Sequence, residues 1–530
     1  MPSQDSALGA VLRSISPKEA VILVVGLIGI VLALEAYKTN IPYIRGLPSV
    51  PSRLPFIGHL YKLGGRSGRN DATVFSEWAR KVGSPVYQCV LGNQRTVVVC
   101  DWATMYELWV GQSHALIDRP HQPGFVDKLG IDLTGFPMTD QVRKCRAAGM
   151  RALAKPSWPK YYHLLEPSSA KFISEVLHKS NSGKAPLDLY AHLRQIVFDL
   201  CLSLTYGARF GAVDDSFMLS FIQSINSVSA VRSSTKPFSH FVPLLRIIPE
   251  SSSQTMAAEK VRRKHRDALY TSYQERVSRG ETVDCIVSML NEDGLTEEEV
   301  HGTCISLLQA APDTVASGVY QAVAWLSSPE GRTTQQRALD AILEAYDGDR
   351  TKAWKMAFRE ERVPLVASLC AETLRFFTFA PYATPRRSTS DIRMPNGALV
   401  PKGTTFIMNA QEVNHDVEKF GADTWSFNPD RFLDAKPGLP HVAFGAGSRI
   451  CPAVAISNRL IRALVTRLML AFDMEASAEP GRKPNNHPIN FSHVVDELVA
   501  HPDFYDCHFK ARDAAWLEGV VGEEQAAARR

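Results

Sequence analysis

Apolar residues are concentrated near the start of the chain, where Ala20–Leu34 forms an uninterrupted apolar run of fifteen residues. Lys18–Glu19 precedes this run, Glu35 ends it, and Ala36–Tyr37 extends its apolar character past the glutamate. A helical membrane span needs roughly 17 to 25 residues, so Glu35 would lie at the headgroup level for this run to reach that length. We predict an uncleaved membrane anchor. The alternative is a cleaved secretory signal, but no small-x-small cleavage site ends the run.

The pattern changes after the anchor. Spaced prolines stiffen residues 42–58 and keep this segment out of a helix. Runs rich in valine at 85–90 and 95–100 predict short strands. Helical patterns dominate from about residue 140 to 380, and short strands return around 391–408. The tail from Glu518 is small and polar, and we expect it to be frayed.

These segments predict three parts of the chain. Residues 1–40 form an N-terminal tail and membrane anchor helix, 41–60 a proline-rich hinge, and 61–530 one large domain without repeats. A small β region, many helices, and then strands and loops follow one another in that domain. This order predicts a mainly α fold with small β sheets.

The composition narrows the class of protein without naming its function. Apolar residues make up 45% of the chain and charged residues 22%, which fits a globular protein with a sizeable core. The net charge of +4 gives no reason to expect a nucleic-acid partner. The nine cysteines include no Cys-x-x-Cys pair, which argues against zinc and thioredoxin chemistry. Their scatter fits a reducing compartment better than a disulfide framework.

One cysteine stands in a distinctive context. Cys451 closes a glycine-bearing loop that also holds Phe444, Gly447 and Arg449, and a helical pattern starts straight after it. A sulfur at a helix N-terminus meets free N–H groups and the helix dipole, which favour a thiolate. Such a thiolate is suited to ligate haem iron. The alternative is a buried free cysteine after a loop.

A second motif lies upstream, where Glu372 and Arg375 are three residues apart. On a helix they share one face and can pair, although such pairs also occur on many solvated faces. The apolar flanks indicate that this helix is buried, and a buried ion pair needs further hydrogen bonds. Arg431, twenty residues before Cys451, offers a third member.

A third motif is the helical stretch 303–315, in which Asp313 and Thr314 follow Pro312. Haem iron held by a thiolate can activate oxygen. This reaction needs protons in a site that otherwise excludes water, and a hydroxyl group beside an acid that takes up protons from solvent can deliver them. Pro312 has no N–H, so the carbonyl of Leu308 loses its helical partner and the helix should kink. The alternative is an ordinary kinked core helix.

The loop resembles the haem-binding loop of the cytochrome P-450 superfamily, Phe-x-x-Gly-x-Arg-x-Cys-x-Gly, at every position but the last, where Ala453 replaces glycine. The resemblance implies haem b, with the Cys451 thiolate as axial ligand of the iron. It also implies that Phe444 packs near the thiolate, that Gly447 permits the tight turn, and that Arg449 pairs with a haem propionate.

The other two motifs resemble parts of the same superfamily. Glu372, Arg375 and Arg431 resemble its Glu-x-x-Arg helix and meander arginine, which implies a structural role around the haem loop. Asp313 and Thr314 resemble the acid–alcohol pair of its long distal helix, which implies a catalytic role in proton delivery. Two positions of that helix depart from the family pattern: Ala311 and Val315.

The resemblance also suggests residues around the haem and the substrate. Arg386 and Arg143 are the predicted propionate partners, with Arg387 and Lys144 next to them. His415 and His441 are interpreted as structural residues and not as iron ligands. Substrate contacts are expected from the variable regions: 117–125, 217–241, Ala310, Ala311 and 379–384.

The resemblance implies an NADPH- and O2-dependent monooxygenase in the endoplasmic reticulum membrane, single-pass, with a cytosolic catalytic domain. Electrons would come from a separate NADPH-cytochrome reductase, because the chain shows no nicotinamide or flavin fingerprint. Residues 53–60, 115–120 and 313–315 resemble the fungal phenylacetate-hydroxylase and m-cresol-hydroxylase type, which implies a small phenolic or aryl-acid substrate in secondary metabolism or aromatic catabolism. Two alternatives remain: a haem-thiolate isomerase or dehydratase without external oxygen, and a non-catalytic membrane binder of haem or sterol.

Overall fold

The computed structural model describes residues 16–122, 126, 130–208, 220–224, 227, 235, 237–247, 250–435 and 438–529. The helices are α2 (Pro17–Thr39), α3 (Asp71–Val82), α4 (Trp102–Met105), α6 (Asp140–Ala152), α7 (Tyr162–Lys179), α8 (Tyr190–Tyr206), α10 (Glu250–Ser278), α11 (Ile286–Glu292), α12 (Glu297–Ser327), α13 (Arg332–Ala345), α14 (Arg350–Met356), α15 (Pro364–Phe376), α16 (Ala410–Val413), α17 (Val417–Phe420), α18 (Val454–Ala471) and α19 (Ala514–Arg529). Shorter turns are η1 (Leu60–Lys62), η2 (Tyr106–Gly111), η3 (Lys155–Lys160), η4 (Phe238–His240), η5 (Pro243–Ile247) and η6 (Gly447–Arg449). The strands are β1 (Val86–Leu91), β2 (Gln94–Val99), β3 (Arg386–Arg387), β4 (Ile392–Arg393), β5 (Leu399–Val400), β6 (Thr405–Met408), β7 (Phe472–Ala476) and β8 (Cys507–Ala511).

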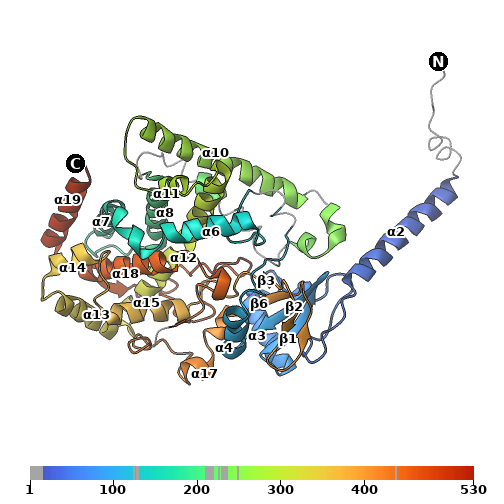
Figure 1. The fold of residues 1–530 in the computed structure, drawn as a ribbon. Helices are drawn as coiled ribbons and strands as arrows, with labels where there is room; N and C mark the ends of the chain where they lie inside the picture. Colours follow the sequence, from blue (N-terminus) through green and yellow to red (C-terminus); the bar gives the residue numbers. More distant parts are fainter. Residues whose placement is uncertain are drawn as a thin grey trace, which may run out of the picture.

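The N-terminal apolar run lies within α2, which projects away from the body (Figure 1). Ser16 and Glu19 form a capping box that starts the helix, because each side chain accepts a hydrogen bond from the other's main-chain N–H. With 23 residues, α2 is roughly 34 Å long, enough for a hydrocarbon core of roughly 30 Å. Among the described residues, it alone is long and apolar enough to cross a membrane.

The proline-rich hinge lies against the small sheet. Gln88 in β1 accepts a hydrogen bond from the N–H of Ile44 (2.7 Å) and donates to the carbonyls of Ile44 and Leu47 (2.8 Å each). Gly58 closes the segment with a φ of 63°, and a Cβ there would lie 2.1 Å from the carbonyl oxygen of Val90. These contacts fix where α2 leaves the body.

The main sheet joins the early strands β1 and β2 to the later strands β3 and β6, which follow the helical part. Its strand order is β1-β2-β6-β3, in which the antiparallel hairpin β1–β2 pairs in parallel with β6. Strands predicted at 85–90 and 95–100 are therefore found within one residue of their expected positions, as β1 and β2. The predicted order of β region, helices and β region is confirmed, and Figure 1 shows the sheet beside the base of α2.

The helical part is built around α12, a 31-residue helix that packs against α8, α15 and α18. Gly318 allows the close approach of α18, because a Cβ there would lie 3.0 Å from Cδ1 of Ile461. Most residues of α12 are buried, and each buried large apolar side chain contributes roughly 1.5 to 3 kcal/mol to folding. α12, which carries Asp313 and Thr314, runs through the middle of the helical part (Figure 1).

The expectation of a frayed tail from Glu518 is wrong, because residues 514–529 form the helix α19. Leu517, Val520 and Val521 are buried on its inner face, at the spacing that a packed helix requires. Glu524 then forms a 2.7 Å ion pair with Arg467 of α18. The small and polar composition of this tail concealed three buried apolar side chains and one partly buried acid, Glu524.

Candidate active site around Cys451

The Cys451 loop is a tight turn that ends where α18 begins. Its main chain closes through a 2.9 Å hydrogen bond from the N–H of Cys451 to the carbonyl oxygen of Phe444. Gly447 has a φ of 61°, and a Cβ there would lie 1.7 Å from the carbonyl oxygen of Trp109, so only glycine fits this approach. The structure thus gives Gly447 and Phe444 the positions in the turn that the sequence motif predicts.

Cys451 differs from every other cysteine of the chain. All nine are free thiols, and eight are buried while Cys451 is partly exposed. Burial raises the pKa of the Cys451 thiol, and this is opposed by the N–H of Ala453 and by Arg146. Burial therefore works against a thiolate at this helix N-terminus, and the charge of a bound metal ion would favour one.

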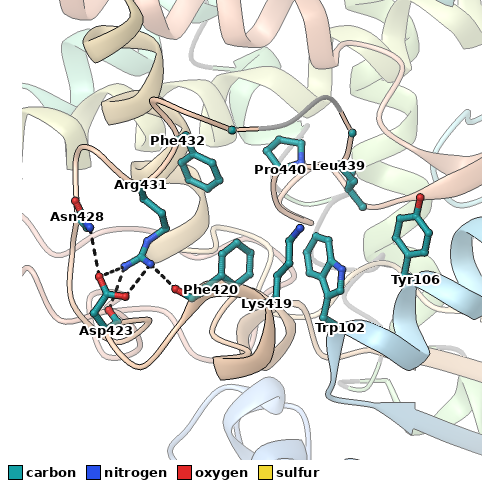
Figure 2. A pocket seen from close by; sticks show the side chains of 12 residues that line it. Trp102, Tyr106, Lys419, Phe420, Asp423, Asn428, Arg431, Phe432, Leu439 and Pro440 are labelled. Carbon is teal, nitrogen blue, oxygen red and sulfur yellow. Dashed lines mark hydrogen bonds and ion pairs between the residues drawn. The ribbon is translucent and has the colours of Figure 1, made fainter.

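Glu372 and Arg375 form a fully buried ion pair on α15, as their spacing predicts. Nε of Arg375 lies 2.7 Å from one carboxylate oxygen of Glu372, and Nη2 lies 2.8 Å from the other. Arg431 donates to the same carboxylate (3.2 Å) and to Asp423 (2.9 Å), as Figure 2 shows for its bonds around Asp423. The three predicted members of the scaffold meet. Of the three, Arg431 lines a surface cavity of about 730 Å³, together with Trp102 and the other side chains of Figure 2.

Asn414 connects this scaffold to the Cys451 loop, and sequence reasoning did not identify it. Its carbonyl oxygen accepts a hydrogen bond from Nη1 of Arg375 (2.8 Å). Its side-chain oxygen accepts from the N–H of Val442 (2.8 Å), two residues before Phe444. The chain Glu372–Arg375–Asn414–Val442 therefore positions the start of the loop.

The two histidines near the loop are packed as structural groups. Nδ1 of His415 lies 2.8 Å from the carbonyl oxygen of Gln411, and its ring stacks on Trp425 with centroids 4.1 Å apart. The ring of His441 lies 6.0 Å from that of Phe444. Burial lowers the pKa of both histidines to about 3, so both are neutral at pH 7. Among the described residues, no three His, Cys, Asp or Glu side chains gather as a metal site.

Four arginines from separate segments are buried beside the Cys451 loop: Arg119, Arg146, Arg386 and Arg449. Arg146 donates to the carbonyls of Ile450 (2.8 Å) and Leu133 (3.2 Å), and Arg449 donates to Ile117 (2.9 Å) and Leu133 (3.4 Å).

Arg386 donates to the carbonyls of Leu116 and Ala446, and Arg119 to those of Thr134 (3.0 Å) and Thr384. None of the four arginines forms an ion pair with a carboxylate in the described part of the chain.

A buried cluster of four cations without a paired anion is costly. Burial, then Arg449 and Arg146, lowers the pKa of Arg386 to about 9. Burial and the three other arginines likewise lower the pKa of Arg119. Two carboxylates placed among these guanidinium groups would offset half of their charge, and haem carries two propionates. The donor set therefore fits haem, because it offers a thiol that could ligate the iron and a cluster of cations that could pair with the propionates.

The sequence predicts Arg143 as a propionate partner, but Arg143 lies outside this cluster. Its side chain is 60% exposed and its nearest carboxylate is that of Asp140 at 3.9 Å. Arg146, three residues later on α6, is the buried arginine. Lys144 pairs with Glu299 (2.9 Å) instead. Arg146 was readable from the sequence, because Val142, Cys145 and Ala152 place the apolar face of α6 beside it.

Asp313 and Thr314 lie in the middle of α12, where two successive turns are partly exposed to solvent. Ala310 is exposed, and Ala311, Asp313 and Thr314 are partly exposed, between buried turns. α12 continues through Pro312 as one helix from Glu297 to Ser327. The helix is therefore not interrupted where the sequence predicts a kink.

Asp313 and Thr314 have different partners. The Oγ1 of Thr314 donates to the carbonyl oxygen of Ala310 (3.0 Å). Oδ1 of Asp313 lies 2.8 Å from Nε of Arg194 on α8. Arg194 lies 119 residues before Asp313 in the chain, so no local signal in the sequence could have linked them.

The predicted substrate regions are only partly described. Arg119 brings two of them together, since it follows Ile117 and donates to the carbonyls of Thr384 and Pro385. Residues 123–125, and of the stretch 217–241 residues 217–219, 225–226, 228–234 and 236, lie outside the described residues.

Comparison with known proteins shows which family the chain belongs to. The Cytochrome P450 family model matches residues 48–497. The chain belongs to the cytochrome P450 family. Phenylacetate 2-hydroxylase of Emericella nidulans is 32% identical over 92% of this chain and 94% of that protein. The 3-hydroxyphenylacetate 6-hydroxylase of the same organism is 29% identical over 90% of each chain.

The fold of a solved cytochrome P450 agrees with this assignment. A zebra fish cytochrome P450 with abiraterone superposes with a TM-score of 0.66, at 18% identity, over 83% of this chain and 100% of that chain. The predictions of the P450 fold, of an oxidoreductase of this family and of haem held by a cysteine thiolate are confirmed. The resemblance to phenylacetate hydroxylases is confirmed as sequence similarity.

Proposed function

We propose that this P450 is a monooxygenase that inserts one oxygen atom from O2 into a small phenolic or aryl-acid substrate. The observation that carries the proposal is the arrangement around Cys451. A partly exposed thiol sits in a loop fixed by the buried Glu372–Arg375 pair, beside four buried arginines that lack an anion. The solvent-accessible turns of α12 would supply an acid and an alcohol, Asp313 and Thr314, for proton delivery.

The chain's own residues would hold the haem. The Cys451 thiolate would ligate its iron, and Arg386, Arg449, Arg119 and Arg146 would pair with its propionates. Haem, when bound, supplies the iron that binds and activates O2. The turn at Gly447 and the packing of Phe444 keep the sulfur in place.

Asp313 and Thr314 would move protons into the site. In the structure Thr314 donates its hydroxyl proton to the carbonyl of Ala310, and rotation about the Cα–Cβ bond would free that proton for another acceptor. Asp313 holds its carboxylate against Arg194, and release from that arginine lets Oδ1 take a proton from solvent. Proton transfer between positioned groups of this kind contributes roughly a hundred- to ten-thousand-fold to rate.

The substrate class follows from the relatives. A phenylacetate 2-hydroxylase and a 3-hydroxyphenylacetate 6-hydroxylase align with about nine-tenths of the chain, and their names describe hydroxylation of aryl acids. We extend this class to the present protein. Phenylacetate, its hydroxylated forms and simple phenols are the compounds to test.

The electron donor and location complete the proposal. A separate NADPH-cytochrome reductase would supply electrons, because the sequence has no nicotinamide or flavin fingerprint. α2 would anchor the protein in the endoplasmic reticulum membrane. Three basic residues follow the apolar run closely and two precede it, which favours a cytosolic catalytic domain: Lys38, Arg45 and Arg53 against Arg13 and Lys18.

The test starts with reduced membranes that contain the full-length protein. We expect a carbon monoxide difference band at the haem-thiolate position, lost in Cys451→Ala and kept in Cys100→Ala, a buried cysteine of the small sheet. Survival of the band in Cys451→Ala would refute the ligand assignment. Spectral titration with phenols and aryl acids then identifies the substrate, and product must require NADPH and O2. Product without them would favour the isomerase or dehydratase, and binding without product would favour the non-catalytic binder.

A further inference from the structure

The joint between α2 and the body bears an open cavity of about 520 Å³. Its walls come from the end of α2 and from the hinge, and not from the Cys451 site. The lining side chains used below are those of Tyr37, Asn40, Arg53 and Phe56. Tyr37 is 82% exposed, so its ring is free to meet whatever surrounds the joint.

Arg53 is the cation of this cavity, and it ties the joint together. Its Nη1 donates to the carbonyl of Ile41 (2.9 Å) and its Nη2 to that of Thr39 at the end of α2. These bonds use two of the five N–H donors of a guanidinium group. No ion pair joins Arg53 to a carboxylate of the described chain. The group therefore keeps both its charge and spare donors for an anion.

The sequence around the joint is basic without compensation. Residues 36–70 contain six Lys or Arg residues and no Asp or Glu. The nearest preceding acid, Glu35, is buried, and its carboxylate accepts a hydrogen bond from the N–H of Leu244 (3.2 Å). A run of basic residues directly beside a membrane span attracts anionic lipids.

Two residues of the hinge are held in the left-handed region of the backbone. The φ of Ser52 is 68° and that of Phe56 is 62°, one on each side of the Leu54–Pro55 wall of the cavity. Side chains other than glycine rarely adopt this conformation, and such strain gathers at ligand clamps. The backbone on both sides of Leu54 and Pro55 is therefore strained.

The position of the joint relative to α2 identifies the ligand. Tyr37–Asn40 follow Leu34, the end of the apolar run, so they lie roughly 5 to 9 Å beyond it along the helix. The headgroup layer is roughly 5 to 7 Å thick on each side of the hydrocarbon core. A bilayer around α2 therefore places phosphate groups at the level of Arg53.

We infer that this cavity binds the phosphate-bearing headgroup of an anionic phospholipid, with Arg53 as its anion ligand and Tyr37 at the lipid interface. The inference rests on the proposed membrane anchoring by α2. A bound headgroup would join the anchor to the body and so fix the angle at which the catalytic domain meets the membrane.

The test uses the full-length haem-loaded protein in detergent with equal amounts of phosphatidylserine and phosphatidylcholine. Mass spectrometry counts each lipid retained per haem. We expect wild type to retain phosphatidylserine about fivefold over phosphatidylcholine, the size of effect expected of one basic residue at a membrane surface. Arg53→Gln should bring the ratio close to one, and Tyr37→Ser should lower it. Arg45→Gln, an exposed basic residue outside the cavity lining, should leave it unchanged.

Several outcomes would overturn the inference. An unchanged ratio in both Arg53→Gln and Tyr37→Ser would show that the cavity is not the site. An equal loss in Arg45→Gln would show diffuse attraction instead of a site. Displacement of the lipid by millimolar inorganic phosphate would make phosphate alone the ligand. Carbonate extraction tests the membrane anchor separately from the lipid-binding cavity. Release of the protein from membranes would refute the anchor, whereas the lipid ratio tests the cavity.

Discussion

Two arginines of the helical part, Arg375 and Arg467, are both fully buried, yet they are held in different ways. Arg375 on α15 pairs with Glu372, three residues earlier, at 2.7 Å. Arg467 on α18 pairs with Glu524, 57 residues later on α19, also at 2.7 Å. The family model ends at residue 497, so the partner of Arg467 lies beyond it. One buried arginine thus finds its carboxylate within the residues that the family model matches, and the other finds it on a helix beyond them.

The difference lies in the carboxylates. Glu372 is fully buried and also accepts hydrogen bonds from Arg431 and from the N–H of Asn428 (2.9 Å). Glu524 keeps 12% of its side chain exposed, and Trp354 is its other partner (3.0 Å). Burial lowers the pKa of Arg467 and raises the pKa of Glu524, so each partner pays a desolvation cost that the pair offsets. The first pair should therefore be harder to break than the second.

The largest effect is expected for Glu372→Ala. The change leaves Arg375 without a carboxylate in a fully buried site, and removing one partner of a buried pair costs about 3 to 5 kcal/mol. We expect that loss in the free energy of unfolding from urea titration, together with reduced haem content, because Arg375 also holds Asn414. Normal stability with normal haem content would show that the pair does not position the loop.

The contrast between these pairs also shows what the sequence could predict. Glu372 and Arg375 are three residues apart, and the Cys451 loop is contiguous, so short-range spacing was sufficient for both. The strands β1 and β2 were visible as runs rich in valine. The Asp-Thr motif was found because it lies on one helix.

Long-range partners were not predictable in this way. Arg194, Asn414 and Glu524 contact their partners across the fold, and no spacing in one sequence indicates such contacts. The error at Arg143 has a different cause, since the phase of α6 decides which arginine is buried and the apolar positions of that helix mark Arg146. The helix α19 was missed because small residues concealed its buried face.

A smaller loss is expected for Glu524→Gln. The amide keeps the shape and can still accept hydrogen bonds, while Arg467 retains the carbonyls of Glu166 (3.0 Å) and Trp354 (3.3 Å). Hydrogen bonds to charged groups contribute about 1.5 to 3 kcal/mol, and we expect a loss in that range. The urea midpoint measures it, and the haem spectrum should stay unchanged at 25 °C.

The neighbouring acid provides the control for this change. Glu523 pairs with Lys355 at 3.2 Å, with both side chains about half exposed or more. An exposed pair contributes about 0 to 1 kcal/mol, so Glu523→Gln should barely move the midpoint. Equal effects of the two substitutions would mean that α19 is held by its apolar face alone, and that Arg467 does not depend on Glu524.

The smallest and most pH-dependent effect is expected for Asp423→Asn, at the exposed edge of the Glu372 scaffold. Arg431 holds the pKa of Asp423 below its ordinary value of 3.8, mainly through hydrogen bonds of 2.9 and 3.0 Å. A carboxyl group with a lowered pKa stabilises the folded state above about pH 3.8, and this contribution is lost as the pH falls through the lower folded value. Because Asp423 is 52% exposed, the difference from wild type should be below about 1 kcal/mol. Urea titrations should show the same difference at pH 7 and pH 5 and its decline below pH 3.8, whereas a difference that grows on acidification would assign the carboxylate a destabilising role.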